Sequence, residues 1–164
     1  MRIANLTALG VFVIDQALKI IVVWWLNLAE RGEIDVIPPL LNFRMAWNRG
    51  VNFGLLAGDA DALRWGLIAV ALAISVWVWI WVRRDAPSAR TQVLAGLLIG
   101  GALGNVVDRV LYGAVADFLN MSCCGIENPF AFNVADICIF VGAFGLVIFA
   151  GRDKPPGHPR GNSP

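Results

Sequence analysis

The sequence is short of charged residues and of the side chains that build most catalytic centres. Asp, Glu, Lys and Arg make up 15% of the 164 residues, where soluble domains average about 25%. The chain holds one histidine, His158, and three cysteines, Cys123, Cys124 and Cys138, which form no CxxC pattern. This scarcity argues against a zinc site and against Ser–His or Cys–His catalysis. Cys138 is interpreted as a small apolar residue, while the redox state of Cys123 and Cys124 stays open.

Motifs of several other protein classes are also absent. The formal net charge of +1 gives no basic surface for a nucleic acid, so no such partner is predicted. The sequence has neither the HExxH motif of zinc peptidases nor the GxxxxGK[ST] loop of nucleotide-binding proteins. What it does have is 58% hydrophobic residues, a composition typical of a membrane protein.

Four segments are long and apolar enough to cross a bilayer as helices, which takes about 20 residues each. They are residues 3–26, 62–82, 92–112 and 134–151. The first is too long for the apolar region of a signal peptide and contains Asp15 and Lys19, so it is predicted to be a retained helix. The sequence thus predicts an all-α integral membrane protein with four transmembrane helices, built as a single domain over residues 1–151.

The distribution of basic residues predicts the orientation of these helices. The basic residues that fall together on one side are Arg2, Arg83, Arg84, Arg90, Arg152, Lys154 and Arg160. Because basic segments tend to stay in the cytoplasm, both termini are predicted to be cytoplasmic. The tail, residues 152–164, is rich in Pro, Gly and polar residues and is predicted to be disordered.

The external loop between the first two spans, residues 27–61, has a pattern of its own. Between Leu41 and Asn48, large apolar residues alternate with smaller or polar ones, a period of two that is typical of a half-buried strand. The loop therefore predicts a small extracytoplasmic β element on the outer membrane surface. A purely structural role and a role in binding an extended substrate by strand addition are both open.

Polar residues inside membrane spans are costly and usually functional. Asp15 and Lys19 are four residues apart, so they are predicted to form a self-neutralising pair that supports a nearby site indirectly. Asn105 and Arg109 share a face of the third span, with Asp108 beside it. Asp108 and Arg109 form either a structural polar cluster or a binding site for a negative or carbonyl-like group.

Glycines mark the third span as a packing surface. Gly96, Gly100 and Gly104 recur every four residues, a small-xxx-small pattern that lets another helix approach closely. Gly101 is predicted to add a second close contact. This pattern favours helix packing rather than chemistry.

Two aspartates flank the hairpin that the third and fourth spans are predicted to form. Asp117 follows the third span and Asp136 begins the fourth, so antiparallel packing brings both to a similar depth at the outer surface. Two close carboxylates do not both ionise readily, and they share one proton. One then activates water while the other polarises a carbonyl, which is the arrangement of an aspartic protease.

Five segments, in order along nearly the whole chain, resemble the lipoprotein signal peptidase family (signal peptidase II) of bacteria. They are DQALK at 15–19, NRGVNFG at 48–54, GGALGNVVDR at 100–109, VADF at 115–118 and FNVADICI at 132–139. Matched position by position, the resemblance implies that Asp117 and Asp136 are the catalytic pair. It implies substrate-binding roles for Asn48, Asn105, Arg109 and Asn133, and places Asp15, Lys19 and Gly101 among the family's supporting residues.

The resemblance also implies an activity and a location. Members of the family cleave the signal peptide from prolipoproteins, before a cysteine that carries diacylglycerol, at the periplasmic face of the inner membrane. They use no metal or organic cofactor and are inhibited by globomycin. The sequence leaves two rival interpretations, a proton-coupled transporter component and a non-enzymatic membrane scaffold. The transporter would be expected to show internal repeats, of which the sequence has no convincing one.

Overall fold

The computed structural model describes residues 1–38, 40–50, 60–122 and 128–149. Its elements, in chain order, are α1 (Arg2–Lys19), the π-helix η1 (Ile20–Trp25), α2 (Leu28–Arg31), β1 (Glu33–Ile37), β2 (Leu41–Asn48), α3 (Ala60–Asp85), α4 (Ala89–Tyr112), β3 (Val115–Asn120) and α5 (Val134–Phe149). The predicted tail, with His158, and the Cys123–Cys124 pair lie outside the described residues.

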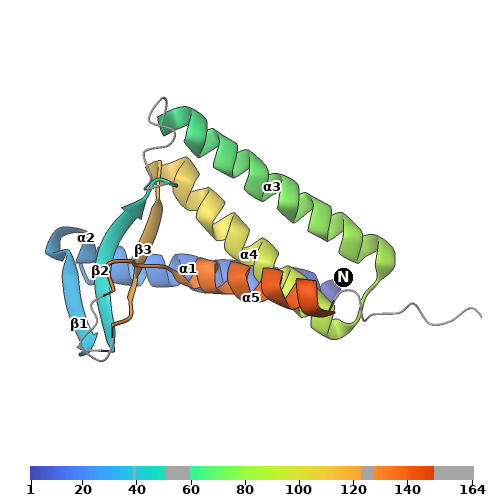
Figure 1. The fold of residues 1–164 in the computed structure, drawn as a ribbon, viewed down its shortest axis with the longest axis horizontal. Helices are drawn as coiled ribbons and strands as arrows, with labels where there is room; N and C mark the ends of the chain where they lie inside the picture. Colours follow the sequence, from blue (N-terminus) through green and yellow to red (C-terminus); the bar gives the residue numbers. More distant parts are fainter. Residues whose placement is uncertain (39, 51–59, 123–127, 150–164) are drawn as a thin grey trace, which may run out of the picture.

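Four long helices lie side by side, with a small sheet across one end (Figure 1). Helix α4 is central and packs against α1, α3 and α5. The N-terminus and the end of α5 lie at the opposite end from the sheet (Figure 1). The chain therefore passes along the length of the molecule four times; it enters the sheet after α1 and after α4, whereas α3 and α4 are joined at the opposite end (Figure 1).

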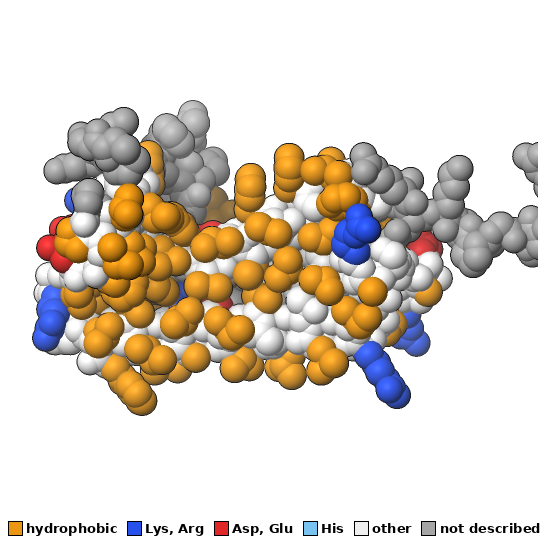
Figure 2. All heavy atoms as spheres, turned by 90° about the horizontal axis from the view of Figure 1, so that it is seen from below, with side chains coloured by type: hydrophobic (Ala, Val, Ile, Leu, Met, Phe, Trp, Pro, Cys, Tyr) orange, Lys and Arg blue, Asp and Glu red, His pale blue; other side chains and the backbone are white. Residues whose placement is uncertain are grey.

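The helices match the four predicted segments, but they are not equal in length. Three of them, Arg2–Trp25, Asp61–Asp85 and Ala89–Tyr112, are long and apolar enough to cross a membrane. Within the described residues α5 has 16 residues, fewer than a full span, so the predicted count of four spans is not confirmed. Figure 2 shows hydrophobic side chains along the whole length of one face, with Lys and Arg gathered toward its ends.

The strand that the alternating pattern predicted is present as β2, which runs from Leu41 to Asn48. The β element is larger than predicted, because it also takes in residues that follow α4. The sheet is antiparallel in the order β1–β2–β3, with Asn48 opposite Val115 and Ala46 opposite Asp117. Asp117, which was predicted to follow the third span, therefore lies in a strand.

The glycines of α4 form close helix contacts, as predicted. An added Cβ at Gly96 would lie 2.6 Å from the carbonyl oxygen of Ala4, and one at Gly100 would collide with the backbone of Ala8, both in α1. On a second side of α4, a Cβ at Gly101 would lie 2.5 Å from the carbonyl oxygen of Ala135 in α5. Two helices thus approach α4 at backbone distance, which is what small residues permit in membranes.

This packing predicts that Gly96→Ala lowers stability. The new methyl group would meet the Ala4 carbonyl, which cannot move without shifting α1, and overpacking of this kind costs about 1–3 kcal/mol. The thermal midpoint in detergent, followed by tryptophan fluorescence, measures the effect. Gly10→Ala is the matched control, because nothing lies within 4 Å of its added Cβ and alanine favours a helix. Equal midpoints for Gly96→Ala and the parent would show that the contact is not tight.

Candidate active site

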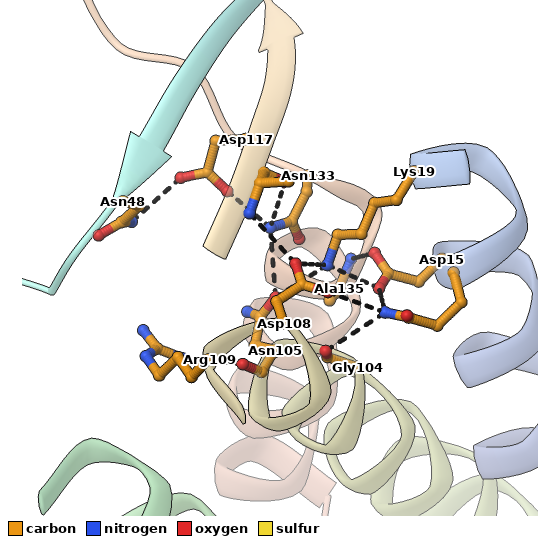
Figure 3. A network of polar contacts seen from close by, with 12 residues as sticks. Asp15, Lys19, Asn48, Gly104, Asn105, Asp108, Arg109, Asp117, Asn133 and Ala135 are labelled. Carbon is orange, nitrogen blue, oxygen red and sulfur yellow. Dashed lines mark hydrogen bonds and ion pairs between the residues drawn. The ribbon is translucent and has the colours of Figure 1, made fainter. Parts of the chain in front are cut away.

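Asp117 is buried in β3 and is held by two side-chain amides. Only 2% of the surface of Asp117 is exposed to solvent. The Nδ2 of Asn48, at the end of β2, donates to Oδ2 at 3.0 Å, and the Nδ2 of Asn133 donates to Oδ1 at 2.6 Å. Both carboxyl oxygens of Asp117 are thus fixed by neighbours from two other segments (Figure 3).

Asp136 occupies the first turn of α5, where it forms a reciprocal cap with Asn133. The Asp136 N–H donates to Oδ1 of Asn133 at 2.8 Å, and the Asn133 N–H donates to Oδ2 of Asp136 at 3.2 Å. This is the pairing of a capping box, in which the residue before a helix and the third residue inside it satisfy each other. The second oxygen of Asp136 accepts from Nδ2 of Asn105 at 2.8 Å.

Asn133 therefore links the two aspartates. Its backbone N–H and its Oδ1 bind Asp136, while its Nδ2 binds Asp117. Because Asn133 is fully buried, it holds the two carboxylates in a fixed relation.

The environment of Asp117 changes its acidity. Burial and then the nearby charge of Asp136 raise the pKa of Asp117 from 3.8 to about 7, although the hydrogen bonds from Asn48 and Asn133 oppose the rise. Asp117 therefore keeps its proton to a higher pH than an ordinary aspartate does, as expected for a buried carboxyl group close to a second one.

Lys19 holds two further carboxylates behind this pair. Its Nζ lies 2.8 Å from Oδ2 of Asp15 and 2.7 Å from Oδ2 of Asp108, and it donates to Oδ1 of Asn105 at 3.3 Å. All four side chains belong to buried residues. The predicted Asp15–Lys19 pair is present, but Asp108 is a second partner that was not predicted.

The two carboxylates bound to Lys19 each hold the backbone beside one aspartate of the pair. Asp108 accepts from the Ala116 N–H at 3.1 Å, and Asp15 accepts from the Ala135 N–H at 3.0 Å. Ala116 directly precedes Asp117, and Ala135 directly precedes Asp136. One lysine thus joins the two chain segments that carry the paired aspartates (Figure 3).

Asp108 and Arg109, which the sequence placed together, have separate surroundings. Asp108 faces Lys19, whereas Arg109 lies on the side away from Lys19 and Asp15 (Figure 3). There Arg109 lines a cavity of about 450 Å³ between α3, α4 and α5, with Asn105 and Asp136 at the same wall. Its Nη1 reaches the carbonyl oxygen of Asn105 at 3.4 Å, and its buried Nε has no partner in the described part of the chain.

The sequence missed several groups of this site. Gln16, whose Nε2 donates to Asp108 at 3.1 Å and to Asp15 at 3.2 Å, was not singled out, although it is polar and lies inside a span. The N-x-x-D spacing in FNVAD is a capping-box signal that would have predicted the Asn133–Asp136 pairing. The N–H groups of Ala116 and Ala135 leave no signal in the sequence. Among the described residues, no group of three or more His, Cys, Asp or Glu side chains is placed to hold a metal ion.

Comparisons with known sequences point to one family, and a comparison with solved structures points to a bacterial membrane enzyme. The sequence model of the signal peptidase (SPase) II family matches residues 7–151. The chain is similar to a lipoprotein signal peptidase of Methylorubrum extorquens, with 37% identity over 94% of this chain and 88% of that protein. A second, from Sphingopyxis alaskensis, is 36% identical over 90% and 84%. A bacterial membrane enzyme solved in meso at 1.9 Å has 30% identity and a TM-score of 0.76, over 92% of this chain and 94% of that one.

The Lys19 network predicts that Lys19→Met is strongly destabilising. The change leaves Asp15 and Asp108 buried without their cation, and breaking a buried ion pair in this way costs about 3–5 kcal/mol. The thermal midpoint in detergent measures the loss. Arg84→Met, at the exposed end of α3, removes a basic residue without a buried partner and should leave the midpoint nearly unchanged. Similar midpoints for the two variants would contradict the network's role.

The raised pKa of Asp117 predicts how Asp117→Asn changes stability with pH. In the parent, the folded state keeps the Asp117 proton to about pH 7, while the unfolded state releases it near pH 4. The proton therefore stabilises the fold at low pH, and this contribution is lost as pH rises from about 4 to about 7. The thermal midpoint of Asp117→Asn should rise relative to the parent over that window and stay level above it. Asp85→Asn, at an exposed position, is the control. If the thermal midpoints of Asp117→Asn and the parent differed by the same amount at every pH, the raised pKa of Asp117 would be contradicted.

Proposed function

The chain belongs to the signal peptidase II family, and from that membership we propose that Asp117 and Asp136 are its catalytic pair. Its function is that of the family: it is a membrane-embedded lipoprotein signal peptidase, an aspartyl endopeptidase that removes the signal peptide of prolipoproteins. The observation that carries the assignment of the pair is the single residue Asn133, whose backbone N–H donates to the carboxyl group of Asp136 and whose side-chain Nδ2 donates to that of Asp117.

The two aspartates take different roles in this proposal. Asp136, which lines the cavity, removes a proton from water as the water oxygen attacks the scissile carbonyl carbon. Asp117, whose pKa is raised to about 7 so that a large fraction carries a proton at neutral pH, gives that proton to the carbonyl oxygen. The resulting diol collapses as the C–N bond breaks: Asp136 passes its proton to the leaving amine, and Asp117 recovers its own from the diol.

In this proposal Arg109 positions the substrate, and the asparagines position the two catalytic carboxyl groups. Arg109 cannot lose its charge in practice, and its buried Nε has no partner among the described residues. A peptide carbonyl entering the cavity beside Asp136 would satisfy that N–H. The two carboxyl groups already accept hydrogen bonds from Asn48, Asn105 and Asn133. These amides therefore hold the catalytic oxygens in place.

The apolar part of the substrate is proposed to occupy the space between α3, α4 and α5. A second cavity, of about 460 Å³, adjoins the first and shares Ile74, Leu98 and Ala143 with it. Its remaining walls are apolar, with Trp77 and Trp81 from α3. This continuous apolar space leads away from Asp136 and suits the signal-peptide helix or the acyl chains of a diacylglyceryl cysteine. Inhibition by globomycin is also proposed, because the chain belongs to the signal peptidase II family.

The orientation is proposed from the charges at the two ends of the molecule. Arg2, Arg83, Arg84 and Arg90 lie at the end away from the sheet, and acidic residues such as Glu33 and Asp35 lie in the sheet. The basic end is therefore proposed to be cytoplasmic. With four spans, both termini are cytoplasmic and the two aspartates lie at the periplasmic face of the inner membrane, where water reaches the scissile bond.

The catalytic pair is tested by replacing each aspartate with an asparagine of the same size. Asp117→Asn and Asp136→Asn should each abolish cleavage of a diacylglyceryl-modified lipobox peptide, because neither proton transfer is possible without both carboxyl groups. Cleavage is measured by mass spectrometry of the released signal peptide, with circular dichroism to verify the fold. Asp35→Asn, exposed on β1, is the control and should cleave normally. Retained activity in either dyad variant would exclude the pair.

A further inference from the structure

Three aromatic rings and one guanidinium surround a pocket that the proposed reaction does not use. The pocket has a volume of about 270 Å³ and is lined by Trp24, Trp47, Arg49, Tyr112 and Ala114; it is called here the aromatic pocket. The ring of Tyr112 lies 5.9 Å from that of Trp24 and 5.7 Å from that of Trp47, centroid to centroid. The three rings come from three different elements, η1, β2 and α4.

The aromatic pocket lies at the level where the membrane ends. Trp24 belongs to the last turn of the first span, and Tyr112 is the last residue of α4. Groups at this level meet lipid headgroups. Tryptophans that only anchor a span are exposed singly, as Trp25 is at 79% exposure. Trp24 and Trp47, in contrast, turn toward a common tyrosine and a common pocket.

The aromatic pocket is distinct from the catalytic site, although β2 contributes to both. Successive residues of a strand point to opposite faces of the sheet. Asn48 points toward Asp117, and its chain neighbours Trp47 and Arg49 line the aromatic pocket instead. Within the described residues, Arg49 forms no ion pair. Its charge is thus available to an anionic group at the pocket.

The chemistry of the lining selects a ligand that carries both charges. A guanidinium binds phosphate through strong, charge-assisted hydrogen bonds. Aromatic faces attract a cationic ammonium group through cation–π interactions. A headgroup with a phosphate and an ammonium group uses both parts of the lining, whereas an anionic headgroup uses only Arg49.

We propose that the aromatic pocket binds the headgroup of a zwitterionic phospholipid, with the phosphate on Arg49 and the ammonium group against the rings of Trp24, Trp47 and Tyr112. The bound headgroup would stabilise the end of β2 on both sides of Asn48. This proposal does not depend on the peptidase mechanism, since the site and the catalytic pair share no residue.

Native mass spectrometry of the delipidated full chain tests the proposal. Phosphatidylethanolamine, phosphatidylglycerol and diacylglycerol with identical acyl chains are titrated separately. Phosphatidylethanolamine should bind at least tenfold more tightly than diacylglycerol, and more tightly than phosphatidylglycerol. Arg49→Gln should weaken its binding by about tenfold. Trp24→Leu should weaken it by about threefold or more and remove the preference over phosphatidylglycerol.

Matched controls separate this site from lipid held anywhere on the surface. Arg44→Gln changes an exposed arginine of β2, the strand that Arg49 directly follows, and Trp25→Leu changes the tryptophan next to Trp24; neither Arg44 nor Trp25 lines the pocket. Both variants should bind phosphatidylethanolamine as the parent does. Equal losses in the controls, or equal affinity for diacylglycerol, would overturn the proposal. Displacement of the lipid by inorganic phosphate at millimolar concentration would also overturn it, because it would identify a simple phosphate site.

Discussion

A lysine buried between two carboxylates is the interaction on which the rest of this site depends. Lys19 reaches Asp15 and Asp108 at ion-pair distance, and each carboxylate in turn accepts the N–H next to one of the paired aspartates. An unpaired charge at this depth would be very costly. Each of the three charges is therefore retained only while the others are in place, and this mutual dependence fixes β3 and the start of α5 relative to α1.

The close packing of the helices allows the hydrogen bonds of the Lys19 network to form. The carboxylate of Asp15 fits against α4 because position 104 has no side chain, since a Cβ at Gly104 would lie 2.6 Å from Asp15 Oδ2. Gly101 lets the backbone of Ala135 approach α4 in the same way. The glycines, which by themselves indicate only close packing, thus bring the acceptors and the backbone donors within hydrogen-bonding distance. A buried network with all its members satisfied also favours one arrangement over its alternatives.

The sequence predicted what depends on composition and short spacing, and it missed what depends on tertiary contacts. Hydropathy located the four helices, and the alternation before Asn48 located β2, because both signals come from neighbouring residues. Asp117 was expected just past the end of the third span, where it does lie, but its place in a strand, β3, was not predicted. No local pattern of six residues reveals that they will pair with a strand formed some 70 residues earlier. Likewise, the i,i+4 spacing predicted Lys19 with Asp15, whereas Asp108 joins them only through the packing of α4 on α1.

Amide hydrogen exchange at Ala116 and Ala135 tests most directly whether Lys19 holds both halves of the site. The two amides are measured in the parent and in Lys19→Met, each relative to the amide of Ala95 in the core of α4, so that a general loss of stability cancels. The account predicts that protection falls at Ala116 and at Ala135 together, because both acceptors lose the same cation. Loss of protection at only one of them, or at neither, would contradict the claim that one lysine positions both aspartates.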